Sequence, residues 1–421
     1  MLKVAKFGGS SLADARCFLQ VRDIVLSDPA RRVVVVSAPG KRHAADHKVT
    51  DLLYLCHAHL EYHVPCWDLF RRIRERFLQI RDGCALQTPV GQMLDDIYAA
   101  LTPAAPRDYL ASRGEYLAAR LMADLLGYEF VDAADWLRFD YAGRVRTEES
   151  FAALHTLADG RRIVTPGFYG ALPDGAVRTF SRGGSDVTGS LAAAALHADV
   201  CENWTDVPGV LAADPRLVPQ AEPIARLTYA QLQALSAVGM QVLHESAVEP
   251  LRAAQIPLHI RSTRQPEAPG TLIGCPDAGG GADGAVAFAA RRGIAMLRLT
   301  PLAPQAAEAV RQIAAQAGVN ILHSSAGFEQ MTLLLEADAA ALHRAAEQLT
   351  RELPRAQLKL RENLSLLAVL QGGKGAAANI VAAVQDAGVP VHELAQADAC
   401  LLLIVNDSQF ETALKAAYGA R

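Results

Sequence analysis

The stretch RRVVVVSAPGKR, residues 31–42, decides the fold class of this chain. Val33 to Val36 form an unbroken run of β-branched residues, which is typical of a strand buried on both faces of a parallel sheet. The small residues that follow, SAPGKR, predict a loop at the carboxyl end of that strand. We therefore expect an α/β protein in which such loops carry a binding site.

The same order of strand, loop and helix recurs along the first part of the chain. Residues 2–7 are apolar and lead into a Gly-Gly-Ser-Ser turn at 8–11 and a predicted helix over 14–26. The later segments with this pattern are RRIVTPGFYG (161–170), TFSRGGSDVTGS (179–190) and CENWTDVPGV (201–210). The alternation predicts an open, mostly parallel sheet with helices on both faces and ligand loops at the carboxyl ends of its strands.

Two changes of composition divide the chain. Between Tyr54 and Leu101, long amphipathic helical patterns indicate an insertion beside the sheet. The segment CPDAGGGADGA (275–285) is rich in glycine, proline and aspartate, as linkers are. The predicted organisation is a first domain over 1–275, a linker over 276–285, and two small domains over 286–360 and 361–421 that can share strands.

An internal repeat follows the linker. AVRQIAAQAGVNILHSSAGFEQMTLLLEAD (309–338) is similar to NIVAAVQDAGVPVHELAQADACLLLIVNDS (379–408), so that Gly318 corresponds to Gly388. Each copy reads as strand, helix, Ala-Gly-Val, strand, strand and helix, which is a βαββα unit. Two copies are too few for a solenoid, so we expect them to pack against each other or against a second chain.

The totals limit the class of protein. The 421 residues include 41 Lys and Arg against 45 Asp and Glu, and the formal charge of −4 predicts neither nucleic acid nor a membrane surface as a partner. The chain has no apolar run of the ~18–20 residues that a membrane-spanning helix needs, and its first residues lack the apolar core of a signal peptide. Its seven cysteines are odd in number and scattered, so we expect reduced thiols and a cytoplasmic protein.

One segment, CHAHLEYHVPC, invites a metal interpretation. Cys56, His59, His63 and Cys66 are spaced for one face of a helix. A single straight helix cannot place four ligands around one ion, however, and Pro65 would end the helix before the last of them. We therefore predict no metal-ligating residues in the chain, and expect buried cysteines and surface histidines in this segment.

Three glycine-containing loops combine residues that suit phosphoryl transfer. The two glycines of KFGGSS allow backbone N–H groups to approach a phosphate, and Lys6 adds an ammonium group. In TFSRGGSDVTGS, Arg182 offers a planar fork for a carboxylate, and Ser185 or Asp186 can cap the helix that follows. The third loop, NWTDVPGVLAADPR (203–216), contains two turn signals. Each loop alone fits an ordinary turn, but together they predict a site that positions phosphates against a carboxylate.

Six blocks resemble motifs of the aspartate kinase (aspartokinase) family, in the order and spacing of that family. They are KFGGSSLAD, VVVVSAPGKR…KVTDLL, SRGEYLAARL, TPGFYGALPDG…TFSRGGSDVTGSLAAAAL, WTDVPGVLAADPR and IRSTRQPEAPGTLI. The resemblance covers nearly the whole chain, because the repeat is similar to the paired ACT domains that bind regulatory amino acids in that family. It implies an N-terminal amino-acid-kinase fold followed by two ferredoxin-like ACT (βαββαβ) domains.

The resemblance also implies an activity. The family uses ATP and Mg²⁺ to phosphorylate the β-carboxylate of L-aspartate to 4-phospho-L-aspartate, the first step toward lysine, threonine and methionine. It further implies a homodimer or higher homo-oligomer, with lysine or threonine as an effector at the ACT domains. A carboxylate acceptor is already ionised at neutral pH, so this reaction needs cations rather than a general base.

The site residues implied by the family fall into three groups. The catalytic residues are Lys6, Arg182 and Asp186. The aspartate pocket is formed by Thr50, Glu115, Phe168, Arg182 and Ser185. The nucleotide contacts are Lys6, Phe7, Gly8, Gly9, Thr205, Asp206, Arg216, Gln241 and Val242. Within these groups, Glu115 would bind the α-ammonium of aspartate, Arg182 its α-carboxylate, and Asp186 would orient Lys6 or Mg²⁺.

Some positions depart from the family pattern. Leu211 stands where many aspartate kinases have tyrosine, and Gln241 where many have lysine. In place of the usual Gln-[GS]-x-Ser-Glu turn, the two ACT repeats have HSSAGFEQMTLL and ELAQADACLLLI. Two alternatives therefore stay open: a catalytically weak or silent amino-acid sensor that acts through its ACT domains, and a kinase of another small amino acid or carboxylate.

Overall fold

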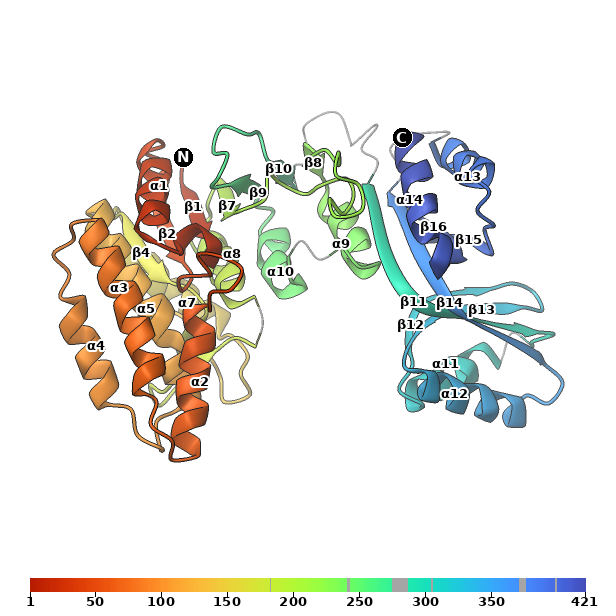
Figure 1. The fold of residues 1–421 in the computed structure, drawn as a ribbon, viewed down its shortest axis with the longest axis horizontal. Coiled ribbons are helices and arrows are strands. Elements are labelled where there is room, and N and C mark those ends of the chain that lie inside the picture. The colour runs from red at the N-terminus through yellow and green to blue at the C-terminus, as the bar shows by residue number, and fades with distance from the viewer. Residues whose placement is uncertain (182, 241–242, 275–286, 304–305, 371–375, 398–399) are drawn as a thin grey trace. The chain divides into compact units, whose positions relative to one another are not determined.

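The computed structural model describes residues 1–421 except 182, 241–242, 275–286, 304–305, 371–375 and 398–399 (Figure 1). The chain divides into two compact units. Unit 1 contains Met1–Val210 and Leu243–Pro276, and unit 2 contains Leu211–Val242 and Asp277–Arg421. The predicted linker, 276–285, lies outside the described residues.

The segment Leu211–Val242 belongs to unit 2, although the predicted first domain runs without interruption over 1–275. Hydrogen bonds explain the difference. The Phe288 N–H donates to the Ala212 carbonyl at 2.7 Å. The hydroxyl of Tyr418, a residue near the end of the chain, donates to the Gln220 carbonyl at 3.2 Å. These partners are far apart in sequence, so composition alone does not reveal them.

Unit 1 is built on a mostly parallel sheet. Its strands follow the order β3-β4-β2-β1-β7-β9-β10, in which β10 is antiparallel to β9. Their bounds are β1 (Lys3–Phe7), β2 (Arg31–Val36), β3 (Glu129–Phe130), β4 (Ile163–Pro166), β7 (Val200–Thr205), β9 (Leu258–Ser262) and β10 (Thr271–Ile273). A separate antiparallel hairpin is formed by β5 (Tyr169–Ala171) and β6 (Val177–Thr179). Val33–Val36 is buried in β2, between parallel neighbours β1 and β4, as the β-branched run predicts.

Helices cover both faces of this sheet (Figure 1). They are η1 (Gly9–Leu12), α1 (Ala15–Leu26), α2 (Val49–Glu61), α3 (Trp67–Gly83), α4 (Val90–Ala99), α5 (Arg107–Leu126), α6 (Ala133–Trp136), α7 (Thr147–Ala158), α8 (Gly184–Ala195) and α10 (Glu245–Ala253). Phe7 of β1 packs into a core with α1 to α5, which include the predicted helical insertion. Lys6, the preceding residue, points to the other face, because a Cβ added at Gly189 of α8 would lie 3.1 Å from its Cβ.

Unit 2 carries the internal repeat on an antiparallel sheet with the order β12-β13-β11-β14-β16-β15. The strands of the unit are β8 (Arg226–Leu227), β11 (Ala287–Thr300), β12 (Asn320–Ala326), β13 (Met331–Glu336), β14 (Gln357–Leu370), β15 (Glu393–Ala397) and β16 (Cys400–Asn406). Its helices are α9 (Tyr229–Ala237), α11 (Ala307–Gln316), α12 (Ala339–Glu352), α13 (Ala376–Asp386), η3 (Asp407–Gln409) and α14 (Phe410–Gly419). Each copy of the repeat therefore has the βαββα order that its sequence predicts.

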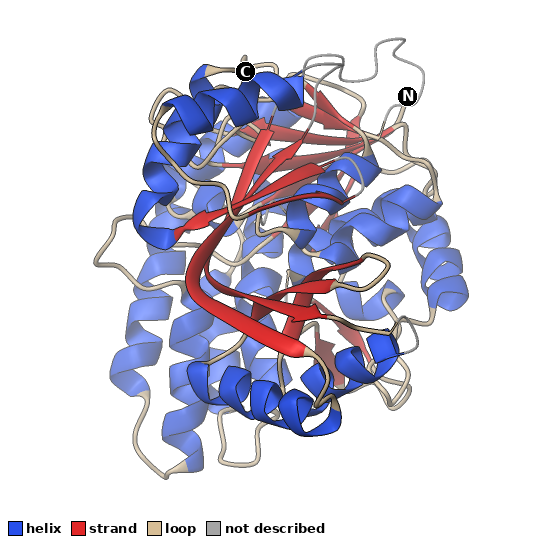
Figure 2. Cartoon of the chain, turned by 90° about the vertical axis from the view of Figure 1, so that its right-hand side faces the viewer, coloured by secondary structure: helices blue, strands red, loops and turns tan. Residues whose placement is uncertain are grey.

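The two copies share their long central strands. β11 and β14 pair from Ala287 opposite Leu370 to Thr300 opposite Gln357, and Figure 2 shows them as long curved ribbons. The second half of β11 pairs with β13, whereas the second half of β14 pairs with β16. Each ferredoxin-like domain therefore completes its four-stranded sheet with half of a strand from the other copy.

Candidate active site

Lys6 and Asp186 form an ion pair at the centre of the unit 1 sheet. Lys6 on β1 is only 7% exposed, and its Nζ lies 2.5 Å from Oδ1 of Asp186 on α8. Asn203 lies beside Lys6 in the parallel register of β1 and β7. Its Oδ1 accepts from Lys6 Nζ at 3.3 Å, and its Nδ2 donates to Asp186 Oδ1 at 3.0 Å. The amide can serve both neighbours only in this orientation, because an ammonium donates and a carboxylate accepts.

Lys6 and Asp186 are thus brought together as predicted, whereas Asn203 is absent from the predicted site. In its motif, NWTDVPG, the turn signals lie in the residues after Asn203. The amide contacts of Asn203 depend instead on which residue of β7 lies opposite Lys6. Register of this kind is set by the assembled sheet and cannot be read from one strand.

The loops after β1 and β2 lie against each other beside this pair. A Cβ added at Gly8 would lie 3.7 Å from Lys6 Nζ, so the backbone passes close to the ammonium group. A Cβ added at Gly9 would come within 2.8 Å of the Ala38 carbonyl oxygen, closer than side chains tolerate. The Gly40 N–H donates to the Gly9 carbonyl at 2.8 Å. Both loops therefore need glycine at their contact, where their backbones lie directly against each other.

Phe7 can offer a ligand only its backbone. Its side chain is fully buried and stacks on Trp204, with the two ring centroids 5.9 Å apart.

Glu115 on α5 is a buried carboxyl group near the loop after β2. It is 5% exposed, and its Oε2 has no hydrogen-bond partner among the described residues. Burial raises the pKa of Glu115 to about 8, although the backbone of Ala38 and the charge of Arg113 favour the ionised form. Gly114 allows this close packing, because a Cβ added there would lie 2.7 Å from the Ala38 Cβ. A buried oxygen without a partner suits a cationic ligand group.

The loop before β5 lies against the first turn of α8. Phe168 has a φ of 79°, which is unusual for a bulky side chain, and its N–H donates to Thr188 Oγ1 at 3.1 Å. A Cβ added at Gly167 would come within 2.6 Å of the Ser185 Cβ. The structure therefore brings the predicted pocket residues Phe168 and Ser185 together, with the backbone of Phe168 held in a strained conformation.

The prediction that Ser185 or Asp186 caps α8 is wrong. The helix begins at Gly184, and its N-cap is Gly183 in the left-handed conformation with a φ of 58°. Ser185 and Asp186 consequently lie inside the first turn, where Asp186 turns its carboxylate to Lys6 rather than to the helix end. Arg182, the predicted contact of the α-carboxylate, lies outside the described residues.

Thr50 lies in the first turn of α2, next to the loop after β2. The Val49 N–H donates to the Pro39 carbonyl at 3.1 Å and so fixes the start of this helix against the loop. Thr50 is half-buried there. Its backbone is therefore held near the same loop as Ala38 and Gly40.

The predicted nucleotide contacts are distributed over both units. Thr205 ends β7, and its Oγ1 lies 3.3 Å from Oδ1 of Asp206, whose carboxylate is 3.6 Å from Arg264. Arg216 belongs to unit 2, where its guanidinium pairs with Asp214 at 2.6 Å. Gln241 and Val242 lie outside the described residues.

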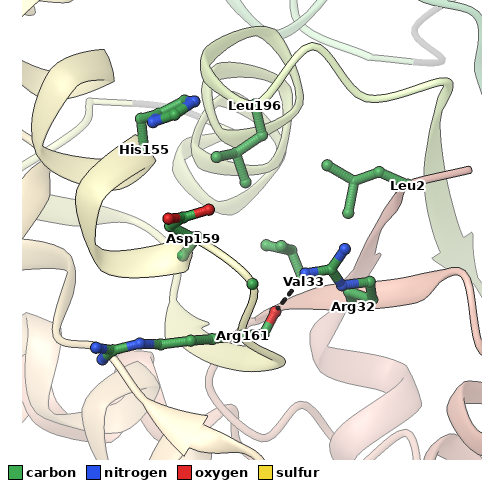
Figure 3. A pocket seen from close by; sticks show the side chains of 9 residues that line it. Leu2, Arg32, Val33, His155, Asp159, Arg161 and Leu196 are labelled. Atoms are coloured by element: carbon green, nitrogen blue, oxygen red, sulfur yellow. Dashed lines mark hydrogen bonds between the residues drawn. The ribbon is translucent and has the colours of Figure 1, made fainter.

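A small cavity lies elsewhere in unit 1 (Figure 3). It has a volume of about 150 Å³ and is lined by Leu2, Arg32, Val33, His155, Ala158, Asp159, Gly160, Arg161 and Leu196. Arg32 lies near the amino end of β2, whereas the loops described above follow the carboxyl ends of β1 and β2. None of the predicted site residues that the structure describes lines this cavity.

The histidine-rich segment begins in the last turns of α2, which ends at Glu61, and continues through the turn that leads to α3. Cys56 and Cys66 are buried and His63 is exposed, as expected, while His59 is half-buried with its Nδ1 3.1 Å from the Pro65 carbonyl. Within the described ranges, no three His, Cys, Asp or Glu side chains lie close enough together to hold a metal ion. No helix in that part of the chain is long and apolar enough to cross a membrane.

Comparisons with known proteins agree on one family. Residues 1–262 match the family model described as the amino acid kinase family. The chain is 32% identical to Aspartokinase 3 of Bacillus subtilis (strain 168), over 99% of this chain and 98% of the relative. The solved structure of Clostridium acetobutylicum aspartate kinase matches with a TM-score of 0.88 and 34% identity, over 100% of this chain and 99% of that one.

A solved enzyme from Escherichia coli extends the comparison. Its aspartokinase III, in complex with aspartate and ADP, matches with a TM-score of 0.72 and 25% identity, over 100% of this chain and 99% of that one. The same enzyme in complex with lysine and aspartate matches with the same TM-score and identity, over 99% of both chains.

Proposed function

Because the chain belongs to the amino acid kinase family, and within it to the aspartokinases, we propose that it transfers the γ-phosphoryl group of ATP to the β-carboxylate of L-aspartate. The product is 4-phospho-L-aspartate, from which lysine, threonine and methionine are made. The structural observation that carries the proposal is the ion pair of the buried Lys6 with Asp186, beside the glycine loop after β1.

The phosphate side of the site rests on Lys6 and the two glycines that follow it. Phosphoryl transfer between two anionic reactants is catalysed mainly by positioning and by neutralising charge. The Lys6 ammonium supplies a positive charge, and the close backbone approach at Gly8 and Gly9 suits contact with phosphate oxygens. Asp186 holds the ammonium in place until the nucleotide enters.

Mg²⁺ fits the same place. It is usually held by one or two carboxylates together with substrate phosphates, and the Asp186 carboxylate is partly exposed beside Lys6. Asp186 would therefore hold the ion together with the nucleotide. When bound, Mg²⁺ neutralises charge on the phosphates.

The aspartate side rests on Glu115. Its unpartnered, buried Oε2 suits the α-ammonium of the amino acid, while Arg182 is proposed for the α-carboxylate and Thr50, Phe168 and Ser185 for the pocket wall. A β-carboxylate oxygen then attacks the γ-phosphorus, and the bond from that phosphorus to the bridging oxygen of ADP breaks. The acceptor is already ionised, so the reaction requires no general base.

Hydroxylamine trapping tests the activity directly. Purified protein given Mg-ATP and L-aspartate should form an aspartyl hydroxamate together with an equal amount of ADP. Lys6→Ala should lower turnover by about 10²–10³-fold, because a charge aimed at the transferring group is lost. Lys415→Ala, an exposed lysine on α14, is the matched control. A folded wild-type protein that forms no hydroxamate would favour the silent sensor, and turnover only with another amino acid or carboxylate would favour a kinase of that substrate.

The proposal extends to nucleotide contacts and regulation. Thr205, Asp206, Arg216, Gln241 and Val242 are proposed to contact ATP, and unit 2 is proposed to bind lysine or threonine in a homodimer. The paired ferredoxin-like folds of unit 2 and the lysine complex of the E. coli relative support the regulatory part. Turnover measured with and without each amino acid, and sedimentation at micromolar concentration, test it. An unregulated monomer would contradict both parts.

A further inference from the structure

We propose that Arg76, on helix α3 of the insertion, is a positioning residue that holds the loops after β1 and β2 in register for phosphoryl transfer. The inference rests on the proposed function, because it gives these loops their role. Arg76 is 4% exposed, which is rare for an arginine.

The guanidinium of Arg76 ties together two backbone segments that are distant in sequence. Its Nη1 donates to the Gly40 carbonyl at 2.8 Å and to the Ala13 carbonyl at 3.3 Å. Gly40 belongs to the loop after β2, and Ala13 directly follows η1, which continues the loop after β1. One nitrogen atom therefore bonds to both loops.

The contact continues to the candidate active site through backbone alone. Gly40 donates to the Gly9 carbonyl at 2.8 Å, and a Cβ added at Gly40 would lie 2.7 Å from that same oxygen. Gly9 follows Gly8, which passes close to Lys6 Nζ. Two hydrogen bonds thus lead from Arg76 through Gly40 to Gly9, in the glycine loop after β1, so a shift of the guanidinium would move Gly9 against Lys6.

Asp46 holds the other terminal nitrogen of the Arg76 guanidinium. Its Oδ2 accepts from Arg76 Nη2 at 2.5 Å, and it also accepts from the backbone N–H of Arg42 at 3.0 Å and from its Nε at 2.9 Å. The Arg42 and Arg76 guanidinium groups hold the pKa of Asp46 well below its usual range. Asp46 therefore stays ionised and keeps Arg76 aimed at the loops at any pH near neutrality.

A role limited to stability explains this arrangement poorly. Desolvating a buried ion pair offsets much of its attraction, and a well-packed apolar side chain often serves stability as well. The Nε of Arg76 is also buried without a partner among the described residues, which adds a further cost. A guanidinium, in contrast, has several N–H donors in one plane, and here it bonds Asp46 and two carbonyl groups at once.

The test compares two substitutions at this position. Arg76→Met keeps the length and apolar stem but removes every donor, and Arg76→Lys keeps a charge that can reach Asp46 or one carbonyl. The readouts are kcat and KM for Mg-ATP and for aspartate, ADP affinity by calorimetry, and the thermal midpoint. Arg71→Met, an exposed arginine on the same helix, is the matched control, and Ile80→Val is a control for lost stability in the buried face of α3.

We expect Arg76→Met to lower kcat/KM for Mg-ATP and ADP affinity by about ten-fold or more, as when one positioning contact is lost, with a smaller change in KM for aspartate. Arg76→Lys should recover part of that loss, whereas Arg71→Met and Ile80→Val should leave both quantities within about two-fold. If Arg76→Met does not fold, Arg76→Lys becomes the test. Folded Arg76→Lys with the kcat/KM for Mg-ATP and the ADP affinity of the wild type would then overturn the proposal.

The outcomes separate this inference from the proposed function. If the wild-type protein lacks aspartate turnover, ADP affinity alone still reports on the phosphate loop. Folded Arg76→Met that binds ADP as the wild type does would refute the positioning role, whatever the substrate of the enzyme. A lower thermal midpoint with unchanged kcat and ADP affinity would show a purely structural role and would equally refute it.

Discussion

At the scale of single residues, Asn203 connects the two charged members of the candidate site. Its amide accepts from Lys6 and donates to Asp186, and it is 7% exposed. Burial of these partners strengthens both hydrogen bonds and makes their loss costly. Under the proposed function, the amide would keep Asp186 in position when Lys6 turns to the phosphates.

Replacing Asn203 tests that role. Asn203→Leu has a similar volume but no hydrogen-bonding groups, so it should lower kcat by about 10–100-fold, the effect of losing a hydrogen bond to a charged group. Initial rates at saturating Mg-ATP and aspartate measure the effect, with circular dichroism to verify folding. A folded variant within two-fold of wild-type kcat would leave Asn203 without a catalytic effect.

Glu115 gives a pH dependence with a definite sign. Burial raises its pKa to about 8, so most of the free protein holds this carboxyl in its neutral form at pH 7. An α-ammonium group pairs only with the ionised form. The value of kcat/KM for aspartate should therefore rise by up to about ten-fold per pH unit below the pKa and level off above it. Profiles from pH 6 to pH 9 measure this.

The matched variant is Glu115→Gln, which keeps the shape of the side chain but cannot ionise. It should lower kcat/KM for aspartate at pH 8.5 by about 10–100-fold and flatten the rise. KM for Mg-ATP should change little, because Glu115 serves the other substrate. A wild-type profile that is already flat from pH 6 to pH 9 would contradict the assignment of the ammonium to Glu115.

At the scale of elements, the contact between the loops after β1 and β2 depends on glycine. Gly9→Ala would place its Cβ 2.8 Å from a backbone oxygen of Ala38, which cannot move aside as a flexible side chain can. The two loops must separate, so kcat should fall by about ten-fold or more, as for a misplaced reacting group. Steady-state rates and thermal midpoints of the variant measure the change.

Gly91→Ala on α4 is the control for this substitution. A Cβ added there meets its nearest atoms only at 3.9 Å, an ordinary contact distance. Gly91 lies in the first turn of α4, and alanine is a better helix former than glycine, so this variant should keep its kcat and be at least as stable as the wild type. Equal losses of kcat in both glycine variants would show that the loop contact has no special role.

Local sequence patterns predicted most of these elements but little of what joins them. The run Val33–Val36 indicated a buried strand, and the helix predicted over 14–26 is found at Ala15–Leu26, because both patterns act over a few residues. The N-cap of α8 was predicted two or three residues too late, since a left-handed glycine ends the preceding loop. Asn203 gains its role from Lys6 and Asp186, 197 and 17 positions away, and Arg76 gains its role from Gly40, 36 positions away. Strand register and helix packing decide such contacts.

At the scale of the whole molecule, a hydrogen-bonded cluster around Asp407 connects strands of unit 2, and we call it the Asp407 anchor. It lies where β14 meets η3. Asp407 accepts two hydrogen bonds from Arg292, at 3.0 Å and 2.9 Å, and one from Ser365 at 2.5 Å. These donors, Arg292 first, lower the pKa of Asp407 to about 2. The bonds connect β11 and β14, the long strands that the two copies share, to η3, which lies between β16 and α14 in the second copy.

This anchor predicts how the stability of unit 2 depends on pH. A carboxylate whose pKa is lower in the folded than in the unfolded state stabilises the fold above the ordinary pKa near 4, and that contribution is lost as the pH falls toward 2. Asp407→Asn should therefore lower the thermal midpoint at pH 7, by only about 1–3 °C because the pair is partly exposed. The difference from wild type should shrink as the pH falls from 4 to 2.5.

Glu347→Gln, an exposed carboxylate on α12 of the same unit, separates this local effect from a general loss of negative charge. The thermal midpoint of this variant should differ little from that of the wild type at pH 7, 4 and 2.5, because removing an exposed charge away from special contacts changes stability little. Thermal unfolding followed by circular dichroism at pH 7, 4 and 2.5 provides the comparison for all three proteins. If Asp407→Asn and wild type remain equally far apart from pH 7 to pH 2.5, the ion pair with Arg292 does not anchor the fold. The substitution would then act through its shape rather than its charge.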